Sequence, residues 1–327
     1  MTCASRAEAG LSDRARQFLD RSGWSGAGCE PLTADASARR YFRLQKSPAR
    51  AVLMDASGNL ESLPPFIHLS RHLNGLGLSA PAVLARDEAA GLLLLEDFGD
   101  NTFARLLDAG SDAEALYRLA TDVLVFLHQH PRAAPEGLRA YHPERMLEDI
   151  ELFLDWRAPG VSAAGREEFK AVWREALPEA HRVPVSLLLR DYHAANLMLV
   201  PGREGIRRAG LLDFQDAYQG PVTYDLVSLL EDARREVSEE TRERMLARYL
   251  ERFPDLDRGA FETSLAVLAA QRHLRVLGIF ERLARRDGKD AYKRSHSPRV
   301  ESRLQRALIH PALQGVKRWI TRYAIQD

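Results

Sequence analysis

The spacing of hydrophobic residues changes near residue 99, and this change limits the possible folds more than any other feature of the sequence. Upstream, YFRL at 41–44 and AVLMD at 51–55 are short hydrophobic runs of the kind found in β-strands. Downstream, hydrophobic residues recur at helical spacing, for example through 112–130 and 142–156. Strands followed by helices are typical of an α+β chain with two lobes.

We therefore predict a β-rich N-terminal lobe over residues 1–98 and a mostly helical C-terminal lobe over residues 99–327. A helix that Ser12 can cap is expected at 12–22, and another helix is expected at 61–78. A chain of 327 residues is long for a single hydrophobic core, which agrees with two lobes.

Composition excludes several classes of protein. The formal net charge is zero, so the chain lacks the basic surface that a general nucleic-acid-binding protein needs. No run approaches the roughly 18 to 20 apolar residues of a membrane span, and the N-terminus lacks the apolar core of a signal peptide. Cys3 and Cys29 do not have the spacing of metal ligands. We expect a cytoplasmic monomer that binds a small molecule and neither nucleic acid nor a membrane.

The strongest chemical signal is a set of polar residues that follow two hydrophobic runs. Asp191 follows the run at 186–189, Asn196 comes five residues later, and Asp213 follows the run at 209–212. If the two runs pair as a hairpin, the three side chains meet at one edge. Their oxygens suit Mg²⁺, which binds one or two carboxylates together with substrate phosphates.

The spacing of Asp191 and Asn196 is that of the catalytic loop of kinases, D-x-x-x-x-N, which a metal-binding acid follows on a later strand. In such a loop the first acid receives or orients the proton of the attacking hydroxyl. Asp191 is therefore the predicted catalytic residue, and Asn196 and Asp213 are the predicted metal ligands. The alternative is a pair of surface turns, in which Asp and Asn are common.

The nucleotide phosphates are expected at a hairpin over 33–44 that contains no glycine. Lysine occurs at only five positions, and none fits the strand that should carry a phosphate-binding lysine. An arginine can take its place, because a guanidinium binds phosphate through two parallel hydrogen bonds. The candidates in this hairpin are Ser37 and the arginines Arg39, Arg40 and Arg43.

A second nucleotide contact is expected where the N-terminal lobe ends. The hydrophobic run at 92–95 stops at Glu96, Asp97 and Phe98, and Gly99 permits a turn into the next lobe. Backbone groups of residues 96 to 98 can then meet the edge of an adenine ring. The alternative is an ordinary strand that ends in a turn.

Two motifs resemble a known superfamily. RDYHAANLML, followed by GLLDFQDAYQGPVTYDLVSLL, is similar to the aminoglycoside phosphotransferase and choline kinase-like proteins, which have a bilobal protein-kinase-like fold. The chain has Arg190 where such proteins often have glycine and Leu189 where they have histidine, but it keeps their second histidine as His193. The resemblance implies ATP and Mg²⁺ as cofactors, and it makes Asp225 an acid that anchors the catalytic loop by hydrogen bonds.

Longer segments resemble one family in particular. TADASARRYFRL, AVLMDA, GLLLLEDFGDNTF, LLDFQDAYQGP and QRHLRVLGIFERLARRDGKDAY together are similar to the N-acetylmuramate/N-acetylglucosamine kinases of bacterial cell-wall recycling. That resemblance implies ATP-dependent phosphorylation of the anomeric hydroxyl to an α-1-phosphate in peptidoglycan recycling. The alternatives are a kinase for aminoglycosides, choline or homoserine, and a kinase-like nucleotide-binding protein without catalysis.

An amino-sugar substrate would meet residues beyond the catalytic loop. Arg272 lies near the centre of a hydrophobic stripe on the helix expected at 261–286, with Arg275 at its edge. A charge in that position must be paired, for instance with Asp225 or Asp216, or must line a polar cavity that holds substrate. The predicted substrate-binding residues are His193, Gln215, Asp216, Arg272 and Arg275.

Overall fold

The computed structural model describes residues 10–32 and 39–324, and Ser37 therefore lies outside the described residues. The chain divides into two compact units. Unit 1 comprises Met1–Ser111 and Ala195–Asp216, and unit 2 comprises Asp112–Ala194 and Ala217–Asp327. The predicted α+β fold is confirmed, with a five-stranded sheet in the N-terminal part and helices through most of the rest. The units differ from the predicted lobes because 195–216 returns to unit 1, and the lobe boundary at residue 98 stays a prediction.

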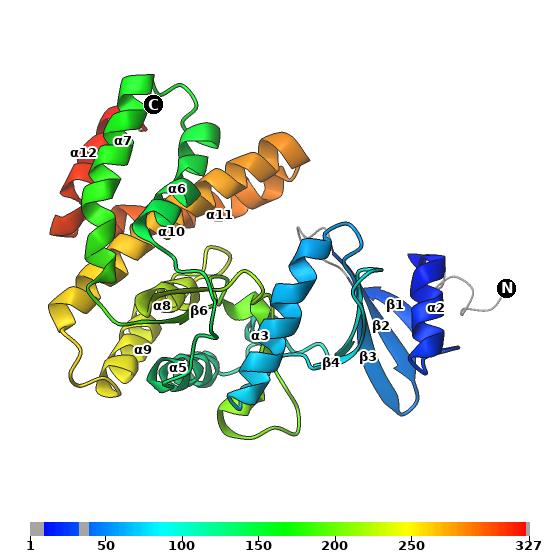
Figure 1. Ribbon diagram of the computed structural model, residues 1–327. Helices are drawn as coiled ribbons and strands as arrows, with labels where there is room; N and C mark the ends of the chain where they lie inside the picture. The colour runs from blue at the N-terminus through cyan, green and yellow to red at the C-terminus, as the bar shows by residue number, and fades with distance from the viewer. Residues whose placement is uncertain (1–9, 33–38, 325–327) are drawn as a thin grey trace. The chain divides into compact units, whose positions relative to one another are not determined.

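Unit 1 is built on a five-stranded antiparallel sheet (Figure 1). The strand order is β1-β2-β3-β5-β4. The predicted hairpin is present as the second and third strands, with Phe42 opposite Leu53. The strands are β1 (Gly28–Leu32), β2 (Arg40–Lys46), β3 (Ala49–Asp55), β4 (Val83–Asp87) and β5 (Leu92–Glu96).

One face of this sheet is covered by α2 (Asp13–Arg21), the first helix in Figure 1. The helix begins as predicted, because the Ser12 hydroxyl accepts a hydrogen bond from the amide of Ala15. Phe18 of α2 packs in one core with Phe42 and other buried side chains of the sheet. Burial of each large apolar side chain contributes roughly 1.5–3 kcal/mol. Since side chains alternate along a strand, residues 41 and 43 of β2 lie on the other face of the sheet.

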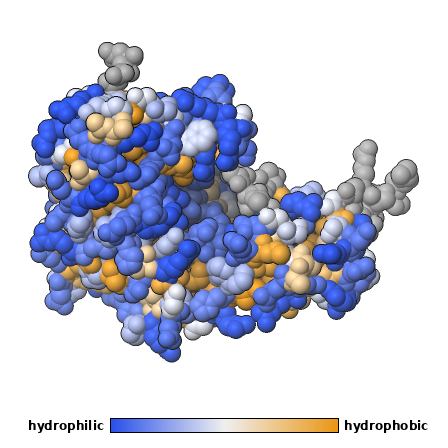
Figure 2. Space-filling view, turned by 45° about the horizontal axis from the view of Figure 1, so that its top comes forward, coloured by the Kyte–Doolittle hydropathy of each residue, from blue (hydrophilic) through white to orange (hydrophobic). Residues whose placement is uncertain are grey.

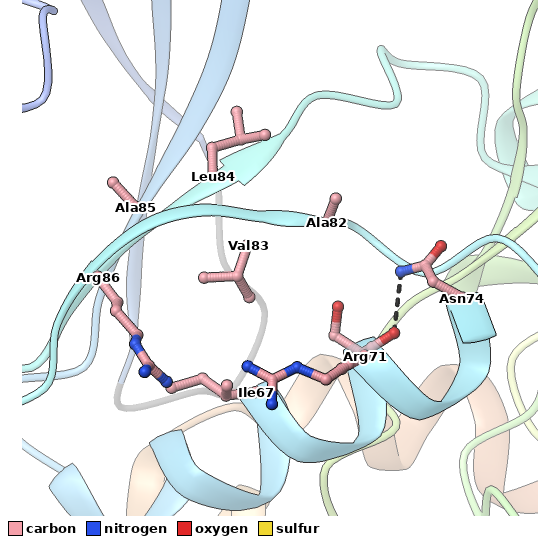
Figure 3. Close-up of a pocket in the computed structure, with 9 residues that line it drawn as sticks. Ile67, Arg71, Asn74, Ala82, Val83, Leu84, Ala85 and Arg86 are labelled. Carbon is pink, nitrogen blue, oxygen red and sulfur yellow. Dashed lines mark hydrogen bonds between the residues drawn. The ribbon is translucent and has the colours of Figure 1, made fainter.

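A cavity of about 410 Å³ lies in unit 1 beside the edge strand β4 (Figure 3). It is bordered by α3 (Leu63–Gly75), which the sequence predicts within 61–78 and which is preceded by η2 (Leu60–Ser62). None of the predicted site residues lines this cavity. Its lining residues are Ile67, Ser70, Arg71, Asn74, Ala82, Val83, Leu84, Ala85 and Arg86.

Helices form most of unit 2, and α10 (Arg258–Asp287) is packed against several of the others. The expected hydrophobic stripe on this helix is buried together with Arg272, and burial extends further round the helix to Gln271 and His273. The physical reason is that α6, α8 and α11 all contact it, and a Cβ at Gly278 would lie 2.8 Å from the backbone of Leu152. The helices of unit 2 are α5 (Ala113–Gln129), α6 (Pro143–Trp156), α7 (Ala163–Ala176), α8 (Thr223–Leu230), α9 (Glu239–Glu251), α10, α11 (Asp290–Ala307) and α12 (Gln314–Tyr323), while α4 (Phe103–Asp108) belongs to unit 1.

The two hydrophobic runs around the catalytic loop do not pair with each other, so the predicted hairpin of 186–189 with 209–212 is wrong. In unit 2, β6 (Val185–Leu188) pairs with β9 (Tyr218–Pro221). In unit 1, β7 (Leu197–Leu199) pairs with β8 (Ala209–Leu211). The partner strands β7 and β9 have only three and four residues, too few for a hydrophobic period to indicate them.

Exposed large hydrophobic residues are scattered over the described part of the chain. The face in Figure 2 is largely hydrophilic, with smaller hydrophobic areas between the polar side chains. Leu60, Leu84, Val185 and Ile309 are exposed large hydrophobic residues, and they belong to four different segments. Within residues 10–32 and 39–324, every helix is too short or too polar to cross a bilayer.

A partly buried histidine in unit 2 makes stability depend on pH. His128 of α5 places Nδ1 2.8 Å from the Tyr249 hydroxyl of α9, and burial lowers the pKa of His128 to about 3. Below about pH 6.5, His128 therefore binds a proton in the unfolded chain but stays neutral in the folded protein. The free energy of unfolding should decrease as the pH falls from about 6.5 towards about 3, and His128 contributes up to about 1.4 kcal/mol per pH unit to that decrease.

We expect His128→Gln to flatten this dependence. Urea unfolding of both proteins between pH 6.5 and 5 should give a slope of unfolding free energy against pH that is smaller in the variant by about 1 kcal/mol per unit. Equal slopes would show that His128 is protonated in the folded protein.

Candidate active site

The predicted catalytic loop follows β6 in unit 2 and is held by Asp225 of α8. The Asp225 carboxylate accepts hydrogen bonds from the backbone amides of Leu189 and Arg190, at 2.6 and 2.9 Å. This is the anchoring role that the family resemblance implies. Burial raises the pKa of Asp225 to about 7, although both amide bonds favour its ionised form. The start of the loop is thus fixed to the first turn of α8.

Asp191 is a partly buried carboxylate surrounded by positive charge. Burial alone would raise its pKa, but the charges of Arg275, Arg272 and Arg190 outweigh that effect and lower the pKa of Asp191 below its ordinary value. The side chain is therefore ionised at neutral pH. An ionised carboxylate can accept a proton, which is the chemistry that the sequence assigns to it.

His193 is buried and lies next to Arg234. Arginine can only donate, so His193 Nε2 accepts the hydrogen bond from Arg234, at 2.9 Å. Burial first, and then the charge of Arg234, lower the pKa of His193 to about 4. His193 is thus neutral, and one of its nitrogens is committed to Arg234. Its predicted substrate contact stays a prediction.

Of the arginines of α10, the two predicted site residues are Arg272, which is buried, and Arg275, which is half-buried. Arg272 is 3% exposed, and its Nη2 donates to the Ser228 hydroxyl at 2.9 Å. Arg272 Nε and Nη1 are buried and have no hydrogen-bond partner among the described residues. Arg275 Nε lies 3.8 Å from a carboxylate oxygen of Asp149 on α6. Both arginines therefore place positive charge near Asp191 of the catalytic loop. Their substrate contacts stay predictions.

The two predicted metal ligands come together in unit 1. Asp213 follows β8, is exposed, and has a φ of 58°. Asn196 ends η4 (Ala194–Asn196), and its side-chain Nδ2 is 3.4 Å from Asp213 Oδ2. The backbone also joins them, because the amide of Leu212 donates to the carbonyl of Asn196 at 3.0 Å. Stacking of Phe214 on Phe66 of α3, with ring centroids 5.0 Å apart, fixes the turn that carries Asp213.

The donors at this turn fit Mg²⁺ bound together with phosphates. One exposed carboxylate and one amide oxygen are hard ligands, and Mg²⁺ in phosphotransfer sites takes few protein ligands and completes its shell with phosphate oxygens and water. Across the described part of the chain, no three His, Cys, Asp or Glu side chains gather in a way that could hold a metal without such help. The donors of Asn196 and Asp213 therefore fit a metal ion that binds together with its nucleotide.

Gln215 connects Asp213 to the next acid, Asp216. Its Nε2 donates to Asp213 at 2.9 Å and to Asp216 at 3.2 Å. Its Oε1 is buried and, among the described residues, lacks a hydrogen-bond partner. Asp216 is exposed. An unsatisfied acceptor and an exposed carboxylate are groups that can receive hydrogen bonds from a sugar.

The arginines of the phosphate hairpin differ in their contacts. Arg43 donates to Asp97, to Asp100 and to the carbonyl of Gly99, so its guanidinium is used within the protein. Arg39 is 8% exposed and is close enough to the Tyr41 hydroxyl to oppose the pKa increase that burial causes there. Arg40 is paired with Asp55. Arg40 and Arg43 are thus paired with acids of unit 1, and which arginine meets phosphate stays a prediction.

Residues 96–98, where the adenine contact is expected, are held on both sides within unit 1. Glu96 donates its amide to the carbonyl of Ala82 at 2.9 Å, and its side chain accepts from Arg203. Phe98 packs in a small core with Met198 and Val200, and the Arg203 guanidinium lies 4.9 Å from its ring centroid. The side chains of residues 96–98 are therefore engaged within unit 1, and a contact of their backbone with adenine stays a prediction.

Comparison with known proteins identifies the family. The phosphotransferase enzyme family matches residues 28–261. A curated N-acetylmuramate/N-acetylglucosamine kinase from Caulobacter vibrioides is 36% identical, over 99% of this chain and 98% of its own. A kinase of the same name from Pseudomonas aeruginosa is 35% identical, over 80% of this chain and 78% of its own. The chain belongs to the N-acetylmuramate/N-acetylglucosamine kinase family, within the phosphotransferase enzyme family.

Solved structures confirm the kinase-like fold of this family member. A choline/ethanolamine kinase family protein from Mesorhizobium loti matches 97% of this chain and 98% of its own with a TM-score of 0.61, at 16% identity. The GDP complex of aminoglycoside 2'-phosphotransferase-IIIa matches 88% of this chain and 96% of its own with a TM-score of 0.62, at 15% identity. The protein is a phosphotransferase with a protein-kinase-like fold.

Sequence reasoning missed the polar cluster behind the loop. Asp149 accepts hydrogen bonds from the Tyr141 hydroxyl and from Arg190, both at 2.7 Å, and it also pairs with Arg145. A signal existed: at helical spacing Asp149 lies among buried residues of α6 such as Ile150, and a buried acid requires partners. Arg190 was conspicuous only as the residue before Asp191.

Proposed function

We propose that the protein is a sugar kinase that transfers the γ-phosphoryl group of ATP to the anomeric hydroxyl of N-acetylmuramate or N-acetylglucosamine, giving the α-1-phosphate in peptidoglycan recycling. The observation that carries the reaction type is Asp191, an ionised carboxylate held among arginines five residues before Asn196. The substrate rests on curated relatives from four bacteria, which share the name N-acetylmuramate/N-acetylglucosamine kinase at 32–37% identity.

In this proposal each residue has a defined task. The Asp191 carboxylate receives the proton of the anomeric hydroxyl as its oxygen bonds to the γ-phosphorus and ADP leaves. Asn196 and Asp213 would hold Mg²⁺, which supplies charge neutralisation at the phosphates when it is bound. Arg39 meets the phosphates in place of a lysine, and the backbone of 96–98 meets adenine. GDP in the structure of a distant fold relative supports a nucleotide as the donor.

Sugar contacts are proposed for Gln215 and Asp216 of unit 1 through their acceptor oxygens, and for His193, Arg272 and Arg275 of unit 2. The arginines suit an anionic acceptor such as N-acetylmuramate, whose lactyl group carries a carboxylate. The same proposal makes the protein a cytoplasmic monomer.

An acceptor panel tests the substrate class. ADP release would be measured with ATP and Mg²⁺ and, separately, N-acetylmuramate, N-acetylglucosamine, kanamycin, choline and homoserine. The proposal predicts release with the two sugars and its loss in Asp191→Asn, which excludes a contaminating ATPase. ADP release with another acceptor alone would support kinase activity but contradict the proposed sugar substrate. ATP binding without release on any acceptor would favour a non-catalytic nucleotide-binding protein.

A further inference from the structure

Arg190 adopts a backbone conformation that suits glycine better than arginine. Its φ is 68°, in the left-handed region where a Cβ is crowded. The amide of Asp191 donates to the carbonyl of Leu189 at 2.9 Å, which closes a γ-turn around Arg190. A γ-turn with positive φ is strained, and such strain persists only where the surrounding structure holds it. Here it lies directly before the proposed base.

The backbone of this turn is held by α8 and α10. Asp225 accepts from the amide of Arg190, as described above. The carbonyl of Arg190 accepts from the Ser228 hydroxyl at 3.1 Å, and Ser228 accepts in turn from Arg272. These bonds need no side chain at position 190, so a glycine there could make the same turn without the strain. The arginine side chain must therefore contribute something that a glycine cannot.

That side chain connects the loop to a different part of unit 2. Arg190 Nη2 donates to Asp149 of α6 at 2.7 Å. Its guanidinium lies 5.5 Å from the ring centroid of Tyr141 and 5.2 Å from that of Tyr218. The residue is 8% exposed, so these contacts are made away from water, where a charge-assisted bond and ring contacts are strongest.

We propose that Arg190 is a positioning residue that fixes the direction of the Asp191 carboxylate. Asp225 and Ser228 hold the backbone of the turn, and Asp149 and two tyrosine rings hold the side chain of Arg190. The backbone therefore has one direction where it enters Asp191. This inference rests on the proposed function, because it takes Asp191 as the base. A displacement of about 1 Å at a reacting group can cost about a hundredfold in rate, which is the scale of effect that such a residue can control.

The surroundings allow the side chain to be removed without stranding a buried charge. Asp149 also pairs with Arg145, accepts from the Tyr141 hydroxyl and lies 3.8 Å from Arg275. Its carboxylate therefore keeps cationic neighbours in Arg190→Gly, and the glycine relieves the strained φ. Arg145→Gln supplies a matched control, because it removes another guanidinium from the same carboxylate and leaves the loop untouched.

Kinetics of Arg190→Gly, Arg190→Lys and Arg145→Gln test the inference. We expect kcat to fall about 10- to 100-fold in Arg190→Gly with the KM for ATP unchanged, to recover in part in Arg190→Lys, and to stay within about twofold of wild type in Arg145→Gln. Wild-type kcat in Arg190→Gly would overturn the proposal. Equal losses in Arg190→Gly and Arg145→Gln would also overturn it, because the cause would then be the general environment of Asp149.

Hydrogen exchange separates this inference from the proposed function, because it requires no substrate. Amides of 186–196 should exchange faster in Arg190→Gly than in wild type and at the wild-type rate in Arg145→Gln. Unchanged exchange in Arg190→Gly would contradict the positioning role whatever the acceptor. If the wild-type protein does not phosphorylate either sugar but exchange is faster in Arg190→Gly, only the proposed function is contradicted.

Discussion

Asp191→Asn should lower kcat for phosphoryl transfer by about 10³-fold and leave the KM for ATP almost unchanged. Asparagine keeps the size of the side chain but cannot accept a proton, and a positioned general base contributes about 10²- to 10⁴-fold to a rate. The positive charges of Arg275, Arg272 and Arg190, which lower the pKa of Asp191, would then face a neutral group. Steady-state kinetics with the acceptor that the panel identifies gives the number directly.

The interpretation of that result requires a folded variant. Circular dichroism, together with ATP affinity measured by calorimetry, should be close to wild type, because loss of one partly buried charge leaves the core and the nucleotide contacts in place. A kcat within about tenfold of wild type would contradict the role of Asp191 as base, since a positioned base is worth more than that.

Asp213→Asn should lower kcat at a fixed Mg²⁺ concentration by roughly a hundredfold or more and raise the Mg²⁺ concentration needed for half-maximal rate. A metal ion supplies several kcal/mol of charge stabilisation at a transferring phosphoryl group, and a carboxamide binds it much less tightly than a carboxylate. Asparagine tolerates the φ of 58° at this position, so the turn should survive the change. The measurement is a Mg²⁺ titration of the rate.

The neighbouring acid provides the comparison for this prediction. Asp216 accepts from the same Gln215 side chain and is also exposed, so Asp216→Asn disturbs the same turn. It should raise the KM for the sugar and leave the Mg²⁺ requirement unchanged. An identical Mg²⁺ dependence in wild type and Asp213→Asn would remove Asp213 from the proposed metal site.

The features that the sequence predicts well are those with a local cause. The cap at Ser12 and the β2–β3 hairpin each follow from a few adjacent residues. The closeness of Asn196 and Asp213 was also expected, but for a wrong reason, because 186–189 and 209–212 do not pair. Short strands far apart in sequence select partners by tertiary packing, and a hydrophobic period of three or four residues does not reveal that choice.

Side-chain partners were the least predictable part of the site. The sequence offers Arg39, Arg40 and Arg43 as alternative phosphate ligands, yet Arg43 is paired with Asp97 and Asp100. Arg190 appeared as a departure from a glycine position, and nothing in a one-dimensional pattern connects it to Asp149, 41 residues away. Such contacts depend on which helix faces come together, and many helix packings satisfy the same hydrophobic pattern.

A single spectrum can show whether the phosphoryl group is transferred to the anomeric hydroxyl. Wild-type protein would be incubated with ATP, Mg²⁺ and N-acetylglucosamine, and the product would be examined by proton-coupled ³¹P NMR. We expect a sugar phosphate whose phosphorus couples mainly to the single anomeric proton. A phosphorus coupled to the two protons of a CH₂ group would place the phosphate on the primary hydroxyl and contradict the proposed function.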